Sequence, residues 1–370
     1  MRVSLKVITI ALALVLLIGL FGCSTQEPAV EKPGTETETE TETETGDKPI
    51  DMKPINISLS HMWPAVHPIE TELALKWKQA IEEATDGLIT VTTYPGATLV
   101  GGADTYEGVE AGIADVGLSV FGYTPGRFPL MQALELPGVV YNNGIVSSYV
   151  TWEAIKQFDL EEVKDTKMLM AFGTGPGHLY TKEPIRTLED IQGKEMRAFG
   201  MTVETLEALG AVPVAMPQSD VYEALSRGVV QGTLAPLEVL EGWRQAEVTE
   251  YITMTPFLYN ATFFFNMNLD VWNSLPPEIQ KIVDEVSEKI FEEVCAGLFE
   301  IMNESALKFA VEETGQQILE LSPQEFERWR NQVMPIQQKY VDSMNAQGLP
   351  GREFLDLIIS LSEKYNNIYK

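Results

Sequence analysis

Two segments of the chain carry nearly the same sequence. Residues 104–118 read DTYEGVEAGIADVGL, and residues 220–234 read DVYEALSRGVVQGTL. Each follows a β-rich run that ends near a proline, so each copy is typical of a strand, a helix and a second short strand. Chance similarity between amphipathic helices is the alternative explanation. We interpret the repeat as the same element in two similar α/β lobes, which predicts a cleft between them.

Strand and helix patterns alternate along the rest of the body, and such alternation favours an α/β sheet. The passage 123–138 is rich in proline and glycine and is predicted to be a loop, and the GTGPG run at 173–177 is predicted to be a glycine-rich crossing. The expected strands are 56–60, 88–93, 167–172, 194–198 and 262–267, and the expected helices are 71–85, 146–158, 188–193 and 203–209.

A long helix is predicted to begin after Pro276 and Pro277, because proline is tolerated in the first helical turn. Apolar residues then recur every four positions up to the region of Gly315. A helix of that length spans about 55 Å at about 1.5 Å per residue. We therefore expect it to cross both lobes. The predicted buried stripe is Ile282, Val286, Ile290, Val294, Leu298 and Met302.

The N-terminus has the pattern of an export signal. Arg2 and Lys6 precede an uncharged run at 7–22, which is shorter than the roughly 20 apolar residues of a membrane span. The run ends at Cys23 in a pattern that resembles the lipobox of bacterial lipoproteins. We predict a signal peptide at 1–22 and a lipid on Cys23; a plain signal peptide or an anchor helix is the alternative.

Residues 23–53 are predicted to form a disordered tether after the lipidated cysteine. Threonine and glutamate alternate across 35–45 without an apolar residue to bury. A flexible chain of about 30 residues has an end-to-end distance on the order of 30 Å. The folded body is therefore expected to begin near Pro54 and to stand off a membrane surface outside the cytoplasm.

The formal net charge of −28 argues against a nucleic-acid partner. With only two cysteines, one of them the predicted lipid site, no intramolecular disulfide is expected. The chain lacks HExxH, GxSxG, CxxC and Walker motifs, so we predict neither catalysis nor a cofactor. The three histidines, His61, His67 and His178, lack the carboxylate or thiol pattern of a metal site, and no metal ligands are predicted.

Arg197 lies in the predicted strand 194–198 with apolar neighbours on both sides. A guanidinium that faces a cleft from a strand can bind a carboxylate through two parallel hydrogen bonds. An exposed arginine paired with Glu195 or Glu204 is the alternative.

The block 185–236 resembles the solute-binding proteins of tripartite ATP-independent periplasmic (TRAP) transporters, and similar elements extend the resemblance over about 54–370. That family has similar runs in which an arginine follows Asp-hydrophobic-x-Gly, and later runs carry Leu-Gly-Ala and Tyr-x-Ala-Leu. The matching positions are Asp190, Gly193, Arg197, Leu209, Gly210, Ala211, Pro213, Met216, Tyr222, Ala224, Leu225, Gly228 and Gly232.

The resemblance implies a periplasmic-binding-protein-like fold, in which two α/β lobes are hinged by strands and crossed by a long helix. It also implies a small organic anion as ligand and a membrane transporter driven by an ion gradient as partner. Arg197 falls on the carboxylate-binding arginine of the family. We place lobe I at 54–175 plus about 264–305, and lobe II at 176–263 plus about 306–370.

Two departures from some members, the sialic acid binders among them, bear on the ligand. His178 stands where those members have a second arginine, and Ala235 replaces an asparagine before Pro236. We therefore expect a monocarboxylate, such as a 2-oxo, branched or aromatic acid, held by Arg197 with help from His61 or His178.

Capture is expected to occur by closure of the two lobes on the ligand. The alternatives are an ABC-type binding lipoprotein and a sensor component that presents ligand to a signalling partner. The predicted ligand contacts are Arg197, His178, Thr233 and Pro236 on one side of the cleft, and His61, Trp63, Phe121 and Tyr123 on the other.

Overall fold

The computed structural model describes residues 52–370. The predicted signal peptide, Cys23 and nearly all of the predicted tether lie outside the described residues. No helix in the described part is both long enough and apolar enough to cross a membrane.

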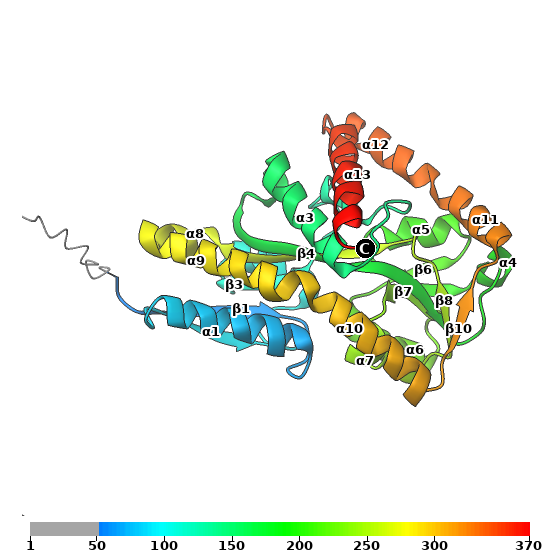
Figure 1. The fold of residues 1–370 in the computed structure, drawn as a ribbon, viewed down its shortest axis with the longest axis horizontal. Coiled ribbons are helices and arrows are strands. Elements are labelled where there is room, and N and C mark those ends of the chain that lie inside the picture. The colour runs from blue at the N-terminus through cyan, green and yellow to red at the C-terminus, as the bar shows by residue number, and fades with distance from the viewer. Residues whose placement is uncertain (1–51) are drawn as a thin grey trace, which may run out of the picture. The chain divides into compact units, whose positions relative to one another are not determined.

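Two units of the same topology confirm the interpretation of the repeat (Figure 1). In the first unit the strands run parallel in the order β2-β1-β3, and in the second they run parallel in the order β6-β5-β7. The two copies of the repeated sequence supply the equivalent elements α2 and β3, and α6 and β7. The first unit comprises β1 (Ile55–His61), α1 (Leu75–Ala84), β2 (Ile89–Tyr94), α2 (Thr105–Glu110) and β3 (Val116–Val120), with a π-helical turn at Ile69–Ala74. The second comprises β5 (Glu195–Ala198), α5 (Thr202–Ala208), β6 (Val212–Ala215), α6 (Gln218–Arg227) and β7 (Gly232–Pro236).

The two units are joined by two long antiparallel strands, β4 (Thr166–Thr181) and β9 (Asn260–Asn268). Strand β9 pairs with β3 and strand β4 pairs with β7, which makes the strand order β2-β1-β3-β9-β4-β7-β5-β6. Two short strands, β8 (Tyr251–Met254) and β10 (Gln317–Glu320), pair with each other, and β8 also pairs with β4.

The glycine-rich run at 173–177 lies inside β4 and is an irregular part of a strand, not a separate connection. The register with β9 shifts between Gly173 and Pro176. Gly175 has a φ of +77°, and a Cβ there would lie 2.7 Å from the nitrogen of Gly144. Only glycine avoids that overlap in this conformation, so the glycines permit a local distortion of a strand that still pairs on both sides.

The predicted long helix is confirmed, and it is continuous through two π-helical turns. In Figure 1 it extends, yellow to orange, from α1 at one end to α7 at the other. Three residues of the predicted stripe are buried, namely Ile290, Leu298 and Met302, whereas Ile282, Val286 and Val294 are half-buried. In the first half of the helix the most buried line is offset from the prediction and runs through Ile279, Val283, Ser287, Phe291 and Cys295. The π turns hold more residues than α turns and keep a four-residue spacing on one face. The segments are α9 (Pro277–Ile290), a π turn (Phe291–Cys295), α10 (Ala296–Lys308) and a second π turn (Phe309–Glu313).

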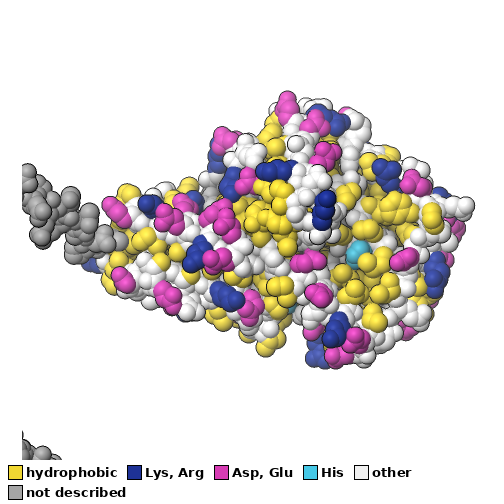
Figure 2. Space-filling model, viewed as in Figure 1, with side chains coloured by type: hydrophobic (Ala, Val, Ile, Leu, Met, Phe, Trp, Pro, Cys, Tyr) yellow, Lys and Arg dark blue, Asp and Glu magenta, His cyan; other side chains and the backbone are white. Residues whose placement is uncertain are grey.

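The C-terminal helices pack back across the molecule. Helix α13 (Gly351–Ile368) lies against α3 (Gly144–Phe158), which in turn packs on β4. The lobe boundaries, including the placement of 306–370 in lobe II, stay a prediction. On the face in Figure 2, basic side chains are separated by acidic and hydrophobic ones. The remaining helices are α4 (Leu188–Ile191), α7 (Val239–Gly242), α8 (Leu269–Ser274), α11 (Pro323–Val333) and α12 (Pro335–Ala346). In and beside the predicted loop, 3-10 turns form at Phe121–Tyr123 and Met131–Glu135.

Candidate ligand-binding site

Strand β5 places Arg197 in the interior of the second unit. The four-residue strand reads EMRA, and Arg197 pairs in register with Val214 of β6 and Thr233 of β7. Only 1% of the Arg197 surface is exposed. A charged side chain this deeply buried normally has a charged partner, because an isolated buried charge is costly.

Arg197 has no such partner among the described residues. Its Nε donates to the carbonyl oxygen of Met216 at 3.1 Å, and Nη2 donates to the Tyr123 hydroxyl at 3.3 Å. The guanidinium carbon lies 4.3 Å from the centre of the Phe199 ring. No carboxylate of residues 52–370 lies within 4.0 Å of the Arg197 guanidinium nitrogens. The geometry therefore leaves the positive charge for an anion that comes from outside.

Arg197 lines a small space, which we name the inner cavity. Its volume is about 20 Å³, the size of one water molecule. Its walls come from both units and from β9, so the space lies where the two units meet. The lining residues are Met62, Trp63, Val120, Tyr123, Arg197, Phe199, Gln218, Pro236, Glu238, Val239, Tyr259, Ala261 and Phe263.

Three neutral groups in the inner cavity have hydrogen-bonding capacity to spare. The side-chain nitrogen of Gln218 and the hydroxyl of Tyr259 are buried without a partner. The Tyr123 hydroxyl accepts from Arg197 and from the backbone N–H of Gln218 at 2.9 Å. Buried polar groups are rarely left unsatisfied, so these groups, together with Arg197, form a cluster suited to a carboxylate.

The inner cavity also contains an acidic residue. Glu238 is 5% exposed, and its Oε2 lies 3.2 Å from Nε2 of His67. The sequence analysis did not single out Glu238, Gln218 or Tyr259. Two of them lie close in sequence to residues that the sequence analysis identified. Gln218 begins the helix of the second repeat, and Glu238 closely follows Pro236.

The structure brings together four of the eight predicted contact residues. Trp63, Tyr123, Arg197 and Pro236 line the inner cavity. Phe121 lines a neighbouring space and packs edge-on against the rings of Phe128 and Phe264. Three predicted residues, His61, His178 and Thr233, are buried but do not line the inner cavity.

His61 is engaged within the first unit. Its Nε2 lies 2.7 Å from Oε2 of Glu70, and Oε1 of Glu70 accepts from the Thr93 hydroxyl at 2.7 Å. Burial raises the pKa of Glu70, but the hydrogen bonds from His61 and Thr93 outweigh it and hold that pKa below its ordinary value. His61 thus has a carboxylate partner of its own.

His178 is a neutral residue at physiological pH. Burial lowers the pKa of its imidazole to about 4, and its Nδ1 accepts the backbone N–H of Thr255 at 2.9 Å. A neutral imidazole cannot supply the charge of an arginine. The position that carries a second arginine in some relatives therefore adds no positive charge here. The roles of His61, His178 and Thr233 in binding stay predictions.

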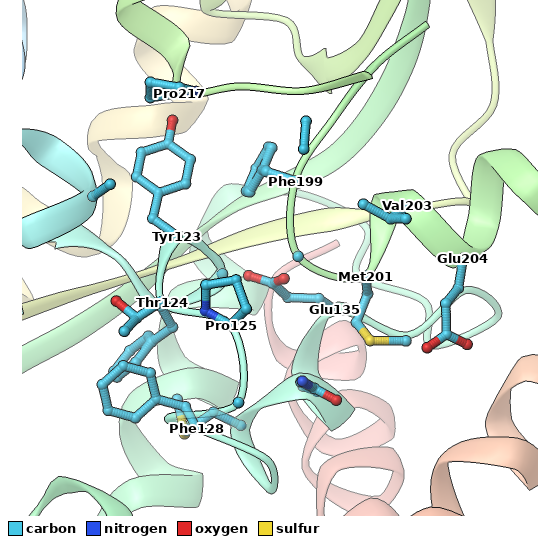
Figure 3. A pocket seen from close by; sticks show the side chains of 18 of the residues that line it. Tyr123, Thr124, Pro125, Phe128, Glu135, Phe199, Met201, Val203, Glu204 and Pro217 are labelled. Atoms are coloured by element: carbon cyan, nitrogen blue, oxygen red, sulfur yellow. The ribbon is translucent and has the colours of Figure 1, made fainter. Parts of the chain in front are cut away.

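A larger space, the outer pocket, lies beside the inner cavity and shares the walls Tyr123 and Phe199 with it. Its volume is about 460 Å³. Figure 3 shows the Glu135 carboxylate between the segment of Tyr123 and Pro125 and the segment of Phe199 and Met201. Oε1 of Glu135 accepts from the Thr262 hydroxyl at 2.8 Å and from the Thr262 N–H at 3.1 Å.

Burial raises the pKa of Glu135 from 4.5 to about 7, although hydrogen bonds from Thr262 oppose the shift. Between pH 4.5 and 7 the unfolded chain loses this proton while the folded protein keeps it, so stability falls as pH rises. The difference in pKa corresponds to about 3 kcal/mol. Glu135→Gln mimics the protonated form. We expect equal stability at pH 4.5 and a Glu135→Gln protein that is more stable by up to about 3 kcal/mol at pH 8, measured by urea unfolding.

Glu204→Gln is the matched control for this prediction, because Glu204 lies on the wall of the same pocket but is exposed. It should unfold with the pH dependence of the unmodified protein. A Glu135→Gln protein with that same pH dependence would contradict the assignment of a buried, protonated Glu135.

No group of three or more metal-ligating side chains occurs within residues 52–370. Cys295, in the π turn of the long helix, is buried and forms no disulfide in this part of the chain. The site therefore consists of hydrogen-bonding and aromatic side chains around one guanidinium.

Comparisons with known proteins agree with this arrangement. Residues 59–343 match the family model described as bacterial extracellular solute-binding protein, family 7. The C4-dicarboxylate-binding periplasmic protein of Rhodobacter capsulatus is 25% identical over 301 residues, which cover 80% of this chain and 89% of the relative.

Solved structures of TRAP solute-binding proteins share the fold. One from Rhodoferax ferrireducens T118, in complex with copurified benzoate, is 26% identical with a TM-score of 0.79 and covers 85% of this chain and 100% of its own. One from Desulfovibrio salexigens DSM2638, solved as an open complex, is 32% identical with a TM-score of 0.73 and covers 84% of this chain and 96% of its own.

The family match covers most of the described chain, and the solved relatives confirm the predicted periplasmic-binding-protein fold with its long helix. The family consists of binding components of transport systems, so the prediction that the chain is not an enzyme is confirmed. The repeated units, an Arg197 without an acidic partner within residues 52–370 and the match over residues 59–343 together place this chain in the family of TRAP transporter solute-binding proteins.

Proposed function

We propose that this protein captures a small monocarboxylate in the inner cavity and delivers it to the membrane subunits of a TRAP transporter. The observation that carries the proposal is Arg197, buried in the inner cavity without an acidic partner among the described residues. Gln218 and Tyr259 add unused hydrogen-bonding groups beside it. Charge-assisted bonds to a carboxylate contribute about 1.5–3 kcal/mol each.

A single carboxylate fits the charge of the inner cavity better than two. Arg197 is the only basic residue in its lining, and His178 is neutral because burial lowers its pKa. The aromatic rings of Trp63, Phe199 and Phe263 offer apolar contact to the body of the ligand. The benzoate-bound relative and a relative from Bordetella bronchiseptica with bound mandelate support an aromatic acid.

Binding requires the two units to separate and close again. A cavity of about 20 Å³ cannot hold an organic acid, since ligand pockets typically enclose about 300 Å³ or more. Strands β4 and β9 are the connections that would bend, and the distortion at Gly175 marks a suitable point on β4. The ligand would shift the equilibrium toward the closed form because it contacts both walls only there.

A screen of organic acids tests the proposal. Thermal melts in the presence of mono- and dicarboxylates should show stabilisation by a subset of monocarboxylates. Mass spectrometry of the acid released from the denatured protein should recover an unchanged carboxylate. A protein that is stabilised only by sugars, cations or dicarboxylates would contradict the proposal.

We also propose that Cys23 carries a lipid that anchors the protein at the outer face of a membrane. The apolar run at 7–22 stops at this cysteine, and a polar tract follows. In cells that express the full chain, the protein should appear in the membrane fraction and incorporate labelled palmitate. Cys23→Ser should lose the label, whereas Cys295→Ser should keep it; a Cys23→Ser protein that still incorporates the label would refute lipidation at Cys23.

A further inference from the structure

Glu238 gives the inner cavity a negative charge as well as a positive one. It follows β7 and precedes α7, and its backbone N–H donates to Oδ1 of Asn303 in the long helix at 3.0 Å. That bond fixes the start of α7 against α10. The carboxylate is consequently held in place at the cavity wall, 5% exposed, on the lining that it shares with Arg197.

His67 does not neutralise Glu238. Nδ1 of His67 accepts the backbone N–H of Ile69 at 3.1 Å, so the ring proton resides on Nε2, which donates to Oε2 of Glu238 at 3.2 Å. A ring with one nitrogen acting as acceptor is the neutral form. His67 therefore satisfies one oxygen of Glu238 with a hydrogen bond. No hydrogen bond from residues 52–370 reaches the other oxygen, Oε1.

Arg197 and Glu238 do not satisfy each other. Among the described residues the Glu238 side chain contacts the His67 ring, and Arg197 forms no ion pair. Both side chains line the inner cavity, and Glu238 also lines the groove that holds His67. A ligand with only a carboxylate would pair with Arg197 but would enclose Glu238 against its apolar body, and burying an uncompensated charge is costly.

We infer that the ligand is an organic acid that also carries a hydrogen-bond donor, a hydroxyl or a protonated amine, and that Glu238 accepts from this donor. The inference rests on the proposed function and deepens it. Arg197 and Gln218 bind the carboxylate, while Glu238, positioned by His67 and Asn303, selects acids by this donor. A protonated amine balances both cavity charges; a hydroxyl satisfies Glu238 without balancing its charge.

Matched acids test the inference by isothermal titration calorimetry. Three series compare a parent acid with a hydroxy acid and an acid that carries a protonated amine: benzoate, 3-hydroxybenzoate and 3-(aminomethyl)benzoate; phenylacetate, mandelate and phenylglycine; propionate, lactate and alanine. In at least one series the unmodified protein should bind a donor-bearing acid at least about 10-fold more tightly than its parent, as expected for a hydrogen bond to a charged acceptor.

Glu238→Gln separates the two kinds of donor. Its neutral amide oxygen can still accept from a hydroxyl, so a preference for the hydroxy acid should shrink only in part. A preference for the amine should disappear, because the amine then enters a cavity without a compensating negative charge. Glu241→Gln is the control: Glu241 is exposed and lies with Glu238 on a groove outside the inner cavity, and its substitution should change neither preference.

The inference fails if the unmodified protein binds each parent acid as tightly as its donor-bearing partners, a result that needs no variant to fold. It also fails if a correctly folded Glu238→Gln protein keeps the original ratio of affinities. Arg197→Met distinguishes this failure from that of the proposed function: undiminished binding of all acids to Arg197→Met contradicts the carboxylate site itself. If no acid in any series binds the unmodified protein, both the inference and the proposed function are wrong.

Discussion

Arg197→Met is expected to weaken binding of the acid found in the ligand screen by at least about 100-fold, or about 3 kcal/mol. The guanidinium is the sole positive charge in the inner cavity lining, and the ligand carboxylate would otherwise be buried without a charged partner. Methionine keeps much of the length and apolar character of the arginine stem. The effect should therefore reflect the lost charge more than a lost shape, and calorimetric titration measures it directly.

The unliganded Arg197→Met protein should be at least as stable as the unmodified protein. Arg197 has hydrogen bonds to Met216 and Tyr123 but no ion pair within the described chain, so its removal relieves an uncompensated buried charge. Arg227→Met is the matched control, because Arg227 is 72% exposed on α6 and pairs with Glu223 at the surface. It should bind ligand normally. Wild-type affinity in Arg197→Met would show that the carboxylate binds elsewhere.

Trp77→Ala is expected to lower the free energy of unfolding by about 3–5 kcal/mol, the usual range for truncating a large buried aromatic residue. Trp77 is fully buried between α1, the long helix and the sheet. Its Nε1 donates to the Ser287 hydroxyl at 3.0 Å, and its ring lies 5.0 Å from that of Phe265, edge to face. Truncation creates a cavity and leaves Ser287 without its donor. Urea unfolding measures the loss.

Trp77→Phe should cost less, about 1–3 kcal/mol, because it keeps most of the aromatic volume and loses chiefly the bond to Ser287. Trp272→Ala provides a comparison at the surface, where a partly exposed ring lies under Lys167 with 4.4 Å between the ammonium and the ring centre. Its effect should be smaller than that of Trp77→Ala. A cost below about 1 kcal/mol for Trp77→Ala would show that α1 and the long helix do not depend on this contact.

Much of the fold could be predicted from local patterns. The repeat predicted two equivalent strand-helix-strand elements, and the structure has them in sheets of the same strand order. The apolar period after Pro277 predicted the long helix. The glycine-rich run at 173–177 was misread as a crossing, because glycines that permit a strand distortion have the same sequence signature as glycines that end a strand.

The stripe of the long helix shows a second limit of local reasoning. Spacing alone does not tell which of two neighbouring lines of residues faces the sheet. The π turns and the packing of α1, α3 and β4 decide that the line through Val283 and Phe291 is buried, while Ile282 and Val286 lie half-buried beside it.

Some residues of the candidate site could be predicted from the sequence, and others could not. Arg197, Trp63, Tyr123 and Pro236 were found from the chain and its family resemblance, and all four line the inner cavity. Gln218, Tyr259 and Glu238 were missed, because nothing in their local sequence distinguishes them from residues of an ordinary helix start, strand or turn. Their significance comes from unused hydrogen-bonding groups, which are a property of the assembled interior.

Residue type and spacing along the chain are enough to predict the alternation of strands and helices, the duplication of one α/β element and the arginine suited to a carboxylate. Only the tertiary structure decided that His178 is neutral, that His61 is paired with Glu70 and that Glu238 faces the same cavity as Arg197. Burial and partner geometry control the charge and availability of each group, and residues distant in the chain supply both.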